Sequence, residues 1–258
     1  MEVSAPVHTR WKGFRDFLIL FRGNLIDLRT RWTWYVTFLS FSSMMFLVFL
    51  WLTMGRNNPG SALYIITGSL TQSLTTAGML SLGQDIGSMK DTSIFDHYAA
   101  LPISKASFIA AMVSKALLFS LPSIAFSLLF ASFVLKIRVV LSVYVLLVVL
   151  LGGYCLVGLG AIVGFYSKTG RVASLATQYL SPVITFLAPV FIPKESLPRF
   201  FQVTSTILPT TYVASALRSA ISGETSAGLM RDLLVLALWT IGSLLLVFPR
   251  LDWRGRRN

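Results

Sequence analysis

The chain has 258 residues, of which 55% are hydrophobic and only 12% are charged, and its mean hydropathy is +0.73. A soluble domain of this length carries about a quarter charged residues, so the composition excludes an ordinary soluble protein and indicates a membrane protein. The net charge is +12, but the basic residues stand at the ends of apolar runs. That placement argues for orientation in a bilayer and against nucleic acid as a partner.

The first 31 residues lack the pattern of a cleavable signal peptide. They contain the stretch WKGFRDFLILFRGNLIDL, which places apolar residues on one helical stripe: Trp11, Phe14, Leu18, Phe21, Leu25 and Leu28. We expect this amphipathic helix to lie in the inner membrane interface, with its basic groups against anionic headgroups. It serves either as a simple membrane anchor or also as a docking surface for a partner.

Six apolar stretches are long enough to cross a bilayer as helices, which takes about 20 residues each. They are Trp32–Met54, Ser61–Gly83, Phe108–Val134, Val139–Tyr166, Val172–Ile192 and Leu233–Phe248. With the N-terminus inside, the inner segments carry fourteen Lys and Arg residues and the outer segments seven, so both termini are expected in the cytoplasm. The chain then divides into a tail with the interfacial helix (1–31), a six-span domain (32–249) and a basic cytoplasmic tail (250–258).

The second predicted span is rich in hydroxyl and amide side chains. Thr71, Gln72 and Thr75 of this span, with Gln178 of the fifth, are candidates to line a translocation pathway. The commoner use of such side chains is hydrogen bonding between helices. In the fourth span, Gly160 and Gly164 form a G-x-x-x-G pair, which indicates close contact with another helix.

Charged residues are almost absent from the predicted spans. Lys115, about two turns from the cytoplasmic end of the third span, is expected to snorkel toward the headgroups rather than to contact a substrate. No Asp or Glu falls inside a predicted span, and the lone cysteine, Cys155, provides no disulfide or metal cluster. The chain has no G-x-S-x-G, H-E-x-x-H or P-loop motif. We therefore expect neither an enzyme nor a bound cofactor, and no ATP hydrolysis by this chain.

A polar stretch, MKDTSIFDHYAALPISK, separates the second span from the third. Ser93 and Asp96 form a capping-box pattern, and Pro102 ends the helix that follows. The apolar face of this helix comprises Ile94, Phe95, Tyr98 and Leu101, and its polar positions are Asp91, Asp96 and His97. A two-turn helix is marginal alone in water, so this face must be buried, either against the foot of the spans, which is the simpler interpretation, or against a partner.

Between the fifth and sixth spans, residues 193–224 predict two short helices broken at Pro209. The first begins near Pro198, and the second is capped by Thr210 or Thr211 and closed by Gly223. Neither helix is long enough to cross a bilayer. We expect a re-entrant hairpin that dips into the outer leaflet, with an amphipathic flap on the outer surface as the alternative.

Two of these stretches resemble the permease subunits of type-2 ABC exporters. FDHYAALPISKASFIAAMVSK is similar to the family's loop between spans two and three. SPVITFLAPVFIPKESLPRFFQVTSTILPTTYVASALRSAISG is similar to its fifth span and outer hairpin, with an aromatic-rich helix, a Pro-x-Thr-Tyr turn and an Ala-Leu-Arg helix that ends at Gly. The span pattern agrees over nearly the whole chain.

The resemblance implies an all-α permease whose loop helix is a coupling helix, docked on a separate cytoplasmic ABC ATPase. Two copies of the chain would join two ATPase subunits. It assigns ATPase coupling to Asp91, Ile94, Phe95, Asp96, His97, Tyr98 and Leu101. It assigns an outer gate to Phe200, Phe201, Pro209, Tyr212, Leu217 and Arg218.

The expected setting is the inner (plasma) membrane of a prokaryotic cell, and the expected activity is export. The mostly apolar spans favour an amphipathic or hydrophobic substrate, such as a drug or a lipid-like molecule. The alternatives are a secondary transporter, which normally needs ionisable groups at mid-membrane, and a structural membrane protein without transport activity.

Overall fold

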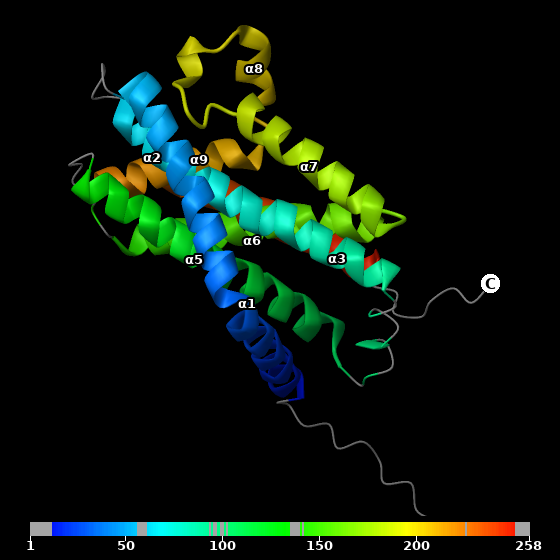
Figure 1. Cartoon of the computed structure of the whole chain (residues 1–258). Coiled ribbons are helices and arrows are strands. Elements are labelled where there is room, and N and C mark those ends of the chain that lie inside the picture. The colour runs from blue at the N-terminus through cyan, green and yellow to red at the C-terminus, as the bar shows by residue number, and fades with distance from the viewer. Residues whose placement is uncertain are drawn as a thin grey trace, which may run out of the picture.

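In the computed structural model the described residues are 12–55, 61–92, 94, 97–98, 101, 103–134, 140, 142–224 and 226–250. All regular secondary structure in these ranges is helical, which confirms the predicted all-α class. The elements are α1 (Lys12–Leu50), η1 (Trp51–Gly55), α2 (Ser61–Thr75), η2 (Thr76–Ser81), α3 (Leu82–Asp91), α5 (Lys105–Phe133), α6 (Val143–Tyr166), α7 (Gly170–Leu187), η3 (Lys194–Ser196), α8 (Arg199–Thr204), α9 (Pro209–Ser222), α10 (Ala227–Val247) and η4 (Phe248–Arg250) (Figure 1).

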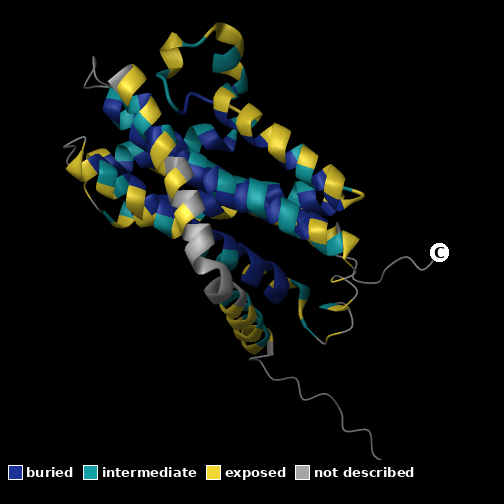
Figure 2. Cartoon of the chain, viewed as in Figure 1, coloured by how far each residue is buried: buried dark blue, intermediate teal, exposed yellow. Residues whose placement is uncertain are grey.

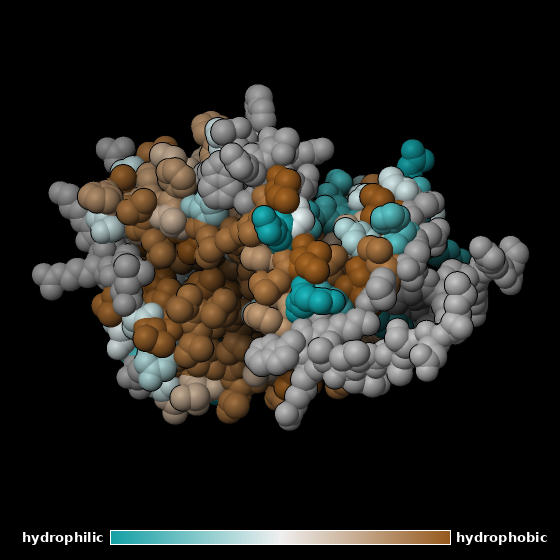
Figure 3. Space-filling model, turned by 90° about the horizontal axis from the view of Figure 1, so that it is seen from below, coloured by the Kyte–Doolittle hydropathy of each residue, from teal (hydrophilic) through white to brown (hydrophobic). Residues whose placement is uncertain are grey.

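Helix occupies most of each predicted apolar stretch, although α7 ends at Leu187, before the predicted end of the fifth span at Ile192. Among the described residues, α5, α6 and α10 are long and apolar enough to cross a membrane by length and composition, and Met44–Thr53 forms a shorter apolar segment. Large hydrophobic side chains of α10 are exposed, among them Leu234, Leu238 and Leu245. The lower face of the molecule is hollowed and covered largely by hydrophobic side chains (Figure 3). These features are typical of a multi-pass membrane protein, whose surface faces lipid.

The helix α1 runs without a break through residue 31, where the sequence predicts a change from an interfacial helix to the first span. The predicted separate N-terminal helix is therefore wrong as an element, since its residues form the first part of α1. Phe14 and Leu18 of the predicted stripe are exposed there. Trp11 lies outside the described residues. The start of α1 is held to α5 by the Ser107 hydroxyl, which donates to the Gly13 carbonyl at 2.7 Å.

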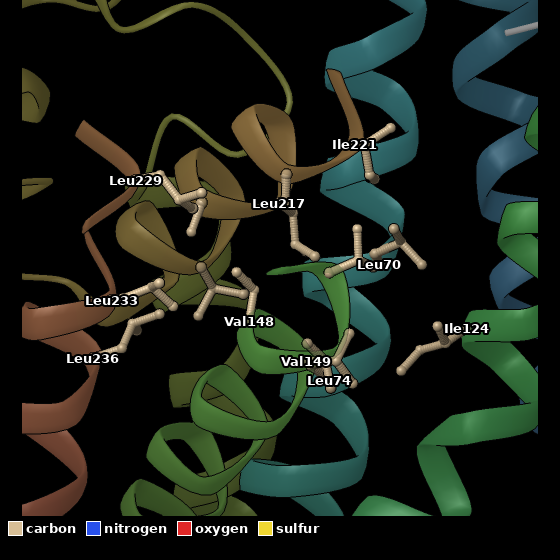
Figure 4. Close-up of a cluster of buried hydrophobic side chains, with 14 of the residues drawn as sticks. Leu70, Leu74, Ile124, Val148, Val149, Leu217, Ile221, Leu229, Leu233 and Leu236 are labelled. Atoms are coloured by element: carbon tan, nitrogen blue, oxygen red, sulfur yellow. The ribbon is translucent and has the colours of Figure 1, made fainter. Parts of the chain in front are cut away.

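The second predicted span is one helical rod, α2–η2–α3, that continues to Asp91, beyond its predicted end at Gly83. A six-residue π turn, η2, lies in its middle. This rod is the most buried part of the fold together with α6, whereas α7 and α8 carry many exposed residues (Figure 2). One hydrophobic cluster joins α2, α5, α6, α9 and α10, with Leu70, Val148 and Leu217 among its buried members (Figure 4).

The rod meets α6 and α7 at glycines. A Cβ built on Gly160 would lie 2.6 Å from the Gly78 carbonyl oxygen, and one built on Gly164 would lie 2.8 Å from Cβ of Ile86. These distances are shorter than real Cβ contacts, so only glycine allows the backbones to approach this closely. The predicted close helix contact of the G-x-x-x-G pair is confirmed.

The hairpin between α7 and α10 has the predicted two helices. Gly223 closes α9 in the left-handed conformation, with φ of 76°, as predicted. The predicted caps are wrong, because Leu208 is the N-cap and Pro209 takes the first helical position. The Thr210 and Thr211 hydroxyls instead donate to the carbonyls of Ile184 and Ser205.

Candidate functional site

The loop between α3 and α5 is the predicted coupling segment. Ile94, His97 and Tyr98 have helical backbone, and the Leu101 N–H donates to the Tyr98 carbonyl at 3.2 Å. The other expected members, Phe95 and Asp96, lie outside the described residues, as do Ser93 and Pro102 of the predicted helix ends.

The predicted apolar face of this loop is divided between two environments. The Tyr98 ring packs against the Phe108 ring of α5, with 5.1 Å between centroids, and belongs to the edge of a cluster formed by α3, α5 and α6. Ile94 and Leu101 are 41% and 42% exposed, and His97 is exposed as well. Tyr98 therefore anchors the loop to the foot of the helices, while Ile94 and Leu101 present an apolar surface outward.

Asp91 does not begin the loop helix but ends α3, where its carboxylate accepts the Gly170 N–H at 2.9 Å. Gly170 is the first residue of α7, so the negative charge lies at the positive end of that helix dipole. The neighbouring Lys90 Nζ donates to the carbonyls of Gly164, Phe165 and Ser167 at 2.7–2.8 Å. The end of α3 is thus hydrogen-bonded to the connection between α6 and α7. Sequence reasoning missed Lys90, because its acceptors are carbonyls more than 70 positions away.

Lys115 faces a carboxylate. Its Nζ lies 3.5 Å from Oδ2 of Asp85 and 5.7 Å from the Phe119 ring centroid. The predicted snorkelling toward headgroups is therefore replaced by an ion pair between α3 and α5. The pair was not anticipated because Asp85 lay beyond the predicted end of the second span, whereas the rod continues past it.

We expect Asp85→Asn and Lys115→Met each to lower thermal stability in detergent, because each leaves a half-buried charge without this partner. The double variant, Asp85→Asn with Lys115→Met, should lose less stability than the sum of the two single changes, with a coupling energy of about 1 kcal/mol for contacting residues. The measurement is thermal unfolding of all four proteins. Strict additivity of the two single changes would show that the pair contributes no interaction.

Most hydroxyl side chains of α2 are buried. Thr71 and Thr75 are fully buried, and their hydroxyls donate to the carbonyls of Thr67 and Thr71, one turn earlier. The hydroxyls of Ser73 and Ser123 lie 2.9 Å apart and join α2 to α5. Of the other pathway candidates, Gln72 is half-buried and Gln178 is exposed on α7. The two threonine hydroxyls therefore bond within α2, whereas Ser73 joins α2 to α5.

In the hairpin between α7 and α10, Arg218 connects several elements. Its Nη2 donates to the Pro189 carbonyl at 2.7 Å, its Nε to Thr67 Oγ1 at 3.3 Å, and its guanidinium lies 4.2 Å from the Tyr64 ring centroid. Burial lowers the pKa of Arg218 from its ordinary value, while the Tyr64 contact opposes that shift. Arg218 therefore fixes α9 to α2 and to the segment after α7.

The remaining gate candidates differ in exposure. Leu217 and Pro209 are buried, and the Tyr212 hydroxyl donates to the Thr206 carbonyl at 2.6 Å. Phe200 is 68% exposed and packs edge-on against Phe201, at 5.5 Å between ring centroids. Leu217, Pro209 and Tyr212 therefore support the hairpin, and Phe200 is its most exposed aromatic member.

A polar pocket of about 260 Å³ lies between the hairpin and the start of α10; we refer to it as the hairpin pocket. Its lining comprises Pro189, Lys194, Thr206, Thr211, Tyr212, Ser215, Arg218, Arg231, Asp232 and Val235. Asp232 is buried, and its Oδ1 accepts from Arg231 Nη2 at 3.2 Å. Asp232 lies just before the predicted start of the sixth span at Leu233, but α10 begins six residues before that start, at Ala227, so that Asp232 lies inside the helix.

No cluster of His, Cys, Asp and Glu suited to a metal ion occurs in the part of the chain that the structure describes. Long apolar helices with exposed hydrophobic faces, connected at one end by α3 and at the other by the partly buried Arg218, define a multi-pass helical membrane protein.

Comparison with known families gives a specific assignment. The family model described as ABC-2 type transporter matches residues 15–222, from the first turn of α1 to the last residue of α9. The chain belongs to the ABC-2 type transporter family, which confirms the resemblance seen in the sequence. No curated protein matches the chain significantly. Its role is that of a transport permease, a membrane component that is generally non-catalytic in this family.

Proposed function

We propose that the chain is half of an ATP-driven exporter, with six spans and both termini in the cytoplasm of a prokaryotic cell. Three of the six spans are α5, α6 and α10, which are long and apolar enough by themselves. The other three would be the end of α1 together with η1, the rod α2–η2–α3, and α7, each of which lies where the sequence predicts a span. The division of basic residues between the two sides supports this orientation.

The coupling proposal rests on the loop after α3, in which one apolar side chain packs on the helices and two others are exposed. A loop that is anchored by Tyr98 but exposes Ile94 and Leu101 offers an apolar contact to a cytoplasmic partner. In this family the partner is usually an ABC ATPase. We propose two ATPase subunits and a second copy of this chain, with Phe95, Asp96 and His97 completing the contact.

A displacement of the same loop can be transmitted to the helices. It follows directly from Lys90 and Asp91, which hold the end of α6 and the start of α7. Displacement of the loop by nucleotide-driven closure of the ATPases would therefore move the α6–α7 connection as a unit, as expected of packed elements with discrete arrangements. The start of α1, tied to α5 at Ser107, would lie against anionic headgroups beside it.

At the other end of α7, the α8–α9 hairpin would dip into the outer leaflet and act as a gate. Arg218 would hold α9 in place, and the exposed Phe200 with its neighbour Phe201 would move with α8. The substrate would be an amphipathic or hydrophobic molecule, drug-like or lipid-like, which suits a surface dominated by apolar side chains.

The test is transport in proteoliposomes that contain the chain with and without its ATPase subunit. We expect ATP-dependent movement of a hydrophobic dye only when both are present. Uphill movement by the chain alone, driven by an ion gradient, would instead establish a secondary transporter. Failure to associate with any ABC ATPase, together with absence of transport, would favour a structural role.

A further inference from the structure

The hairpin pocket lies next to an apolar groove along α10. A second cavity, of about 320 Å³, is lined by Ile162, Val235, Leu238, Trp239, Gly242, Ser243 and Leu246; we refer to it as the α10 groove. Val235 lines both cavities. The polar pocket and the apolar groove therefore adjoin on one helix.

The polar end favours an anion. Three cationic side chains, Lys194, Arg218 and Arg231, line the hairpin pocket against one carboxylate. That carboxylate, Asp232, is buried and bound by Arg231, whereas Lys194 and Arg231 are exposed at the pocket. An entering group therefore meets the exposed cations Lys194 and Arg231 first, and such charges suit phosphate oxygens.

The apolar end has the length of one leaflet. From Val235 to Leu246 the helix rises about 16 Å at 1.5 Å per residue. The hydrocarbon layer of one leaflet is about 15 Å thick, half of the bilayer core. A hydrocarbon chain attached to a headgroup in the hairpin pocket would therefore lie along the α10 groove for its full depth.

We propose that the hairpin pocket and the α10 groove form one binding site for an anionic amphiphile, with a phosphate headgroup beside Lys194 and Arg231 and a hydrocarbon chain beside Trp239 and Gly242. A membrane phospholipid and an exported lipid-like substrate share this chemistry. Only the placement of the site in the outer leaflet rests on the topology proposed above; the binding itself does not.

Quenching of Trp239 fluorescence by brominated acyl chains tests the site directly. The purified full chain in detergent is titrated with phosphatidylglycerol or phosphatidylcholine carrying dibrominated chains, and Trp239→Phe supplies the signal of the other tryptophans. We expect saturable quenching of Trp239 by the anionic lipid at concentrations about fivefold or more below those needed for phosphatidylcholine, because each nearby cation favours negative headgroups.

Matched variants separate the two ends of the site. Lys194→Gln should weaken phosphatidylglycerol binding about fivefold, and Arg199→Gln, an exposed cation of the same hairpin outside the pocket, should not. Lys194→Gln is preferred to a change of Arg231, because Arg231 also binds the buried Asp232 and its loss could prevent folding.

Gly242→Leu tests the apolar end. It should reduce quenching by both lipids, since a Cβ at Gly242 meets nothing within 4 Å and the leucine side chain would occupy the groove. Gly23→Leu, equally open in α1, is the control.

Equal binding of the two lipids, or quenching unaffected by Lys194→Gln and Gly242→Leu, would overturn the proposal. In proteoliposomes with the ATPase, loss of quenching on addition of ATP identifies a transported amphiphile, and persistent quenching identifies a resident lipid. The binding assay uses neither ATP nor the ATPase, so its failure is distinct from a failure of the proposed exporter function.

Discussion

Ile94→Asp is expected to abolish ATP-dependent transport while the chain still inserts and folds. Ile94 is 41% exposed, so the charge costs little in the isolated chain, but an unpaired carboxylate buried in an apolar contact with the ATPase costs about 2 kcal/mol or more. Transport should fall about tenfold or more, with basal ATP hydrolysis retained by the ATPase. Leu101→Asp should behave alike. The measurements are dye transport, ATP hydrolysis and co-purification of the ATPase.

Two matched changes sharpen this test. Ile94→Leu keeps an apolar side chain and should keep coupling. Tyr98→Asp should lower thermal stability as well as transport, because the ring packs on Phe108 inside the chain. If Ile94→Asp and Leu101→Asp transport like the wild type, the loop after α3 is not the coupling surface, whatever the effect at Tyr98.

Gly160→Ala is expected to destabilise the fold strongly. The added methyl would lie within 2.8 Å of the Gly78 and Met79 carbonyl oxygens and the Met79 Cα, which are backbone atoms of the rod and cannot turn aside as a side chain can. Overpacking of this kind costs about 1–3 kcal/mol, and a contact with backbone lies at the upper end. Thermal unfolding in detergent, with the monodisperse yield, provides the measurement.

The control is Gly242→Ala in α10, where the same methyl meets no atom within 4 Å. It should leave the unfolding temperature nearly unchanged or raise it slightly, because alanine favours helix over glycine by about 1 kcal/mol. Equal stability of the two alanine variants would show that the rod and α6 do not approach as closely as the structure places them.

Local signals in the sequence predicted the helices well. Apolar length marked each helix, Pro209 and Gly223 marked the ends of α9, and Gly160 with Gly164 marked a close crossing. Each of these signals acts through the backbone of its own neighbourhood, through a missing N–H, a permitted φ or a missing Cβ. The family could also be predicted, because the loop and the hairpin carry distinctive residue orders.

Contacts between distant residues were not predictable from one sequence. Nothing in the sequence around Lys115 indicates that it pairs with Asp85, thirty positions earlier. Likewise, nothing around Lys90 indicates that it donates to carbonyls of α6. Thr71 and Thr75 were candidates for a pathway, yet they are buried with hydroxyls bonded to their own helix. A polar side chain has the same appearance in the sequence whether it faces water, a substrate or a neighbouring backbone, so only the packing decides.

The π turn at Thr76–Ser81 has a consequence for the whole rod. Its wider winding puts the residues after it out of phase with those before it, by up to the rotation of one residue, about 100°. A single helical wheel drawn through the whole rod would therefore assign some residues to the wrong face. The two halves have different neighbours, since α2 packs against α5 and α9 and α3 packs against α6 and α7. Rewinding η2 as α-helix at its full length would rotate Asp85, Lys90 and Asp91 together away from their partners. Deleting one residue from η2 as it rewinds would keep these three residues in phase, because five α-helical residues cover about the same rotation as six residues of a π turn.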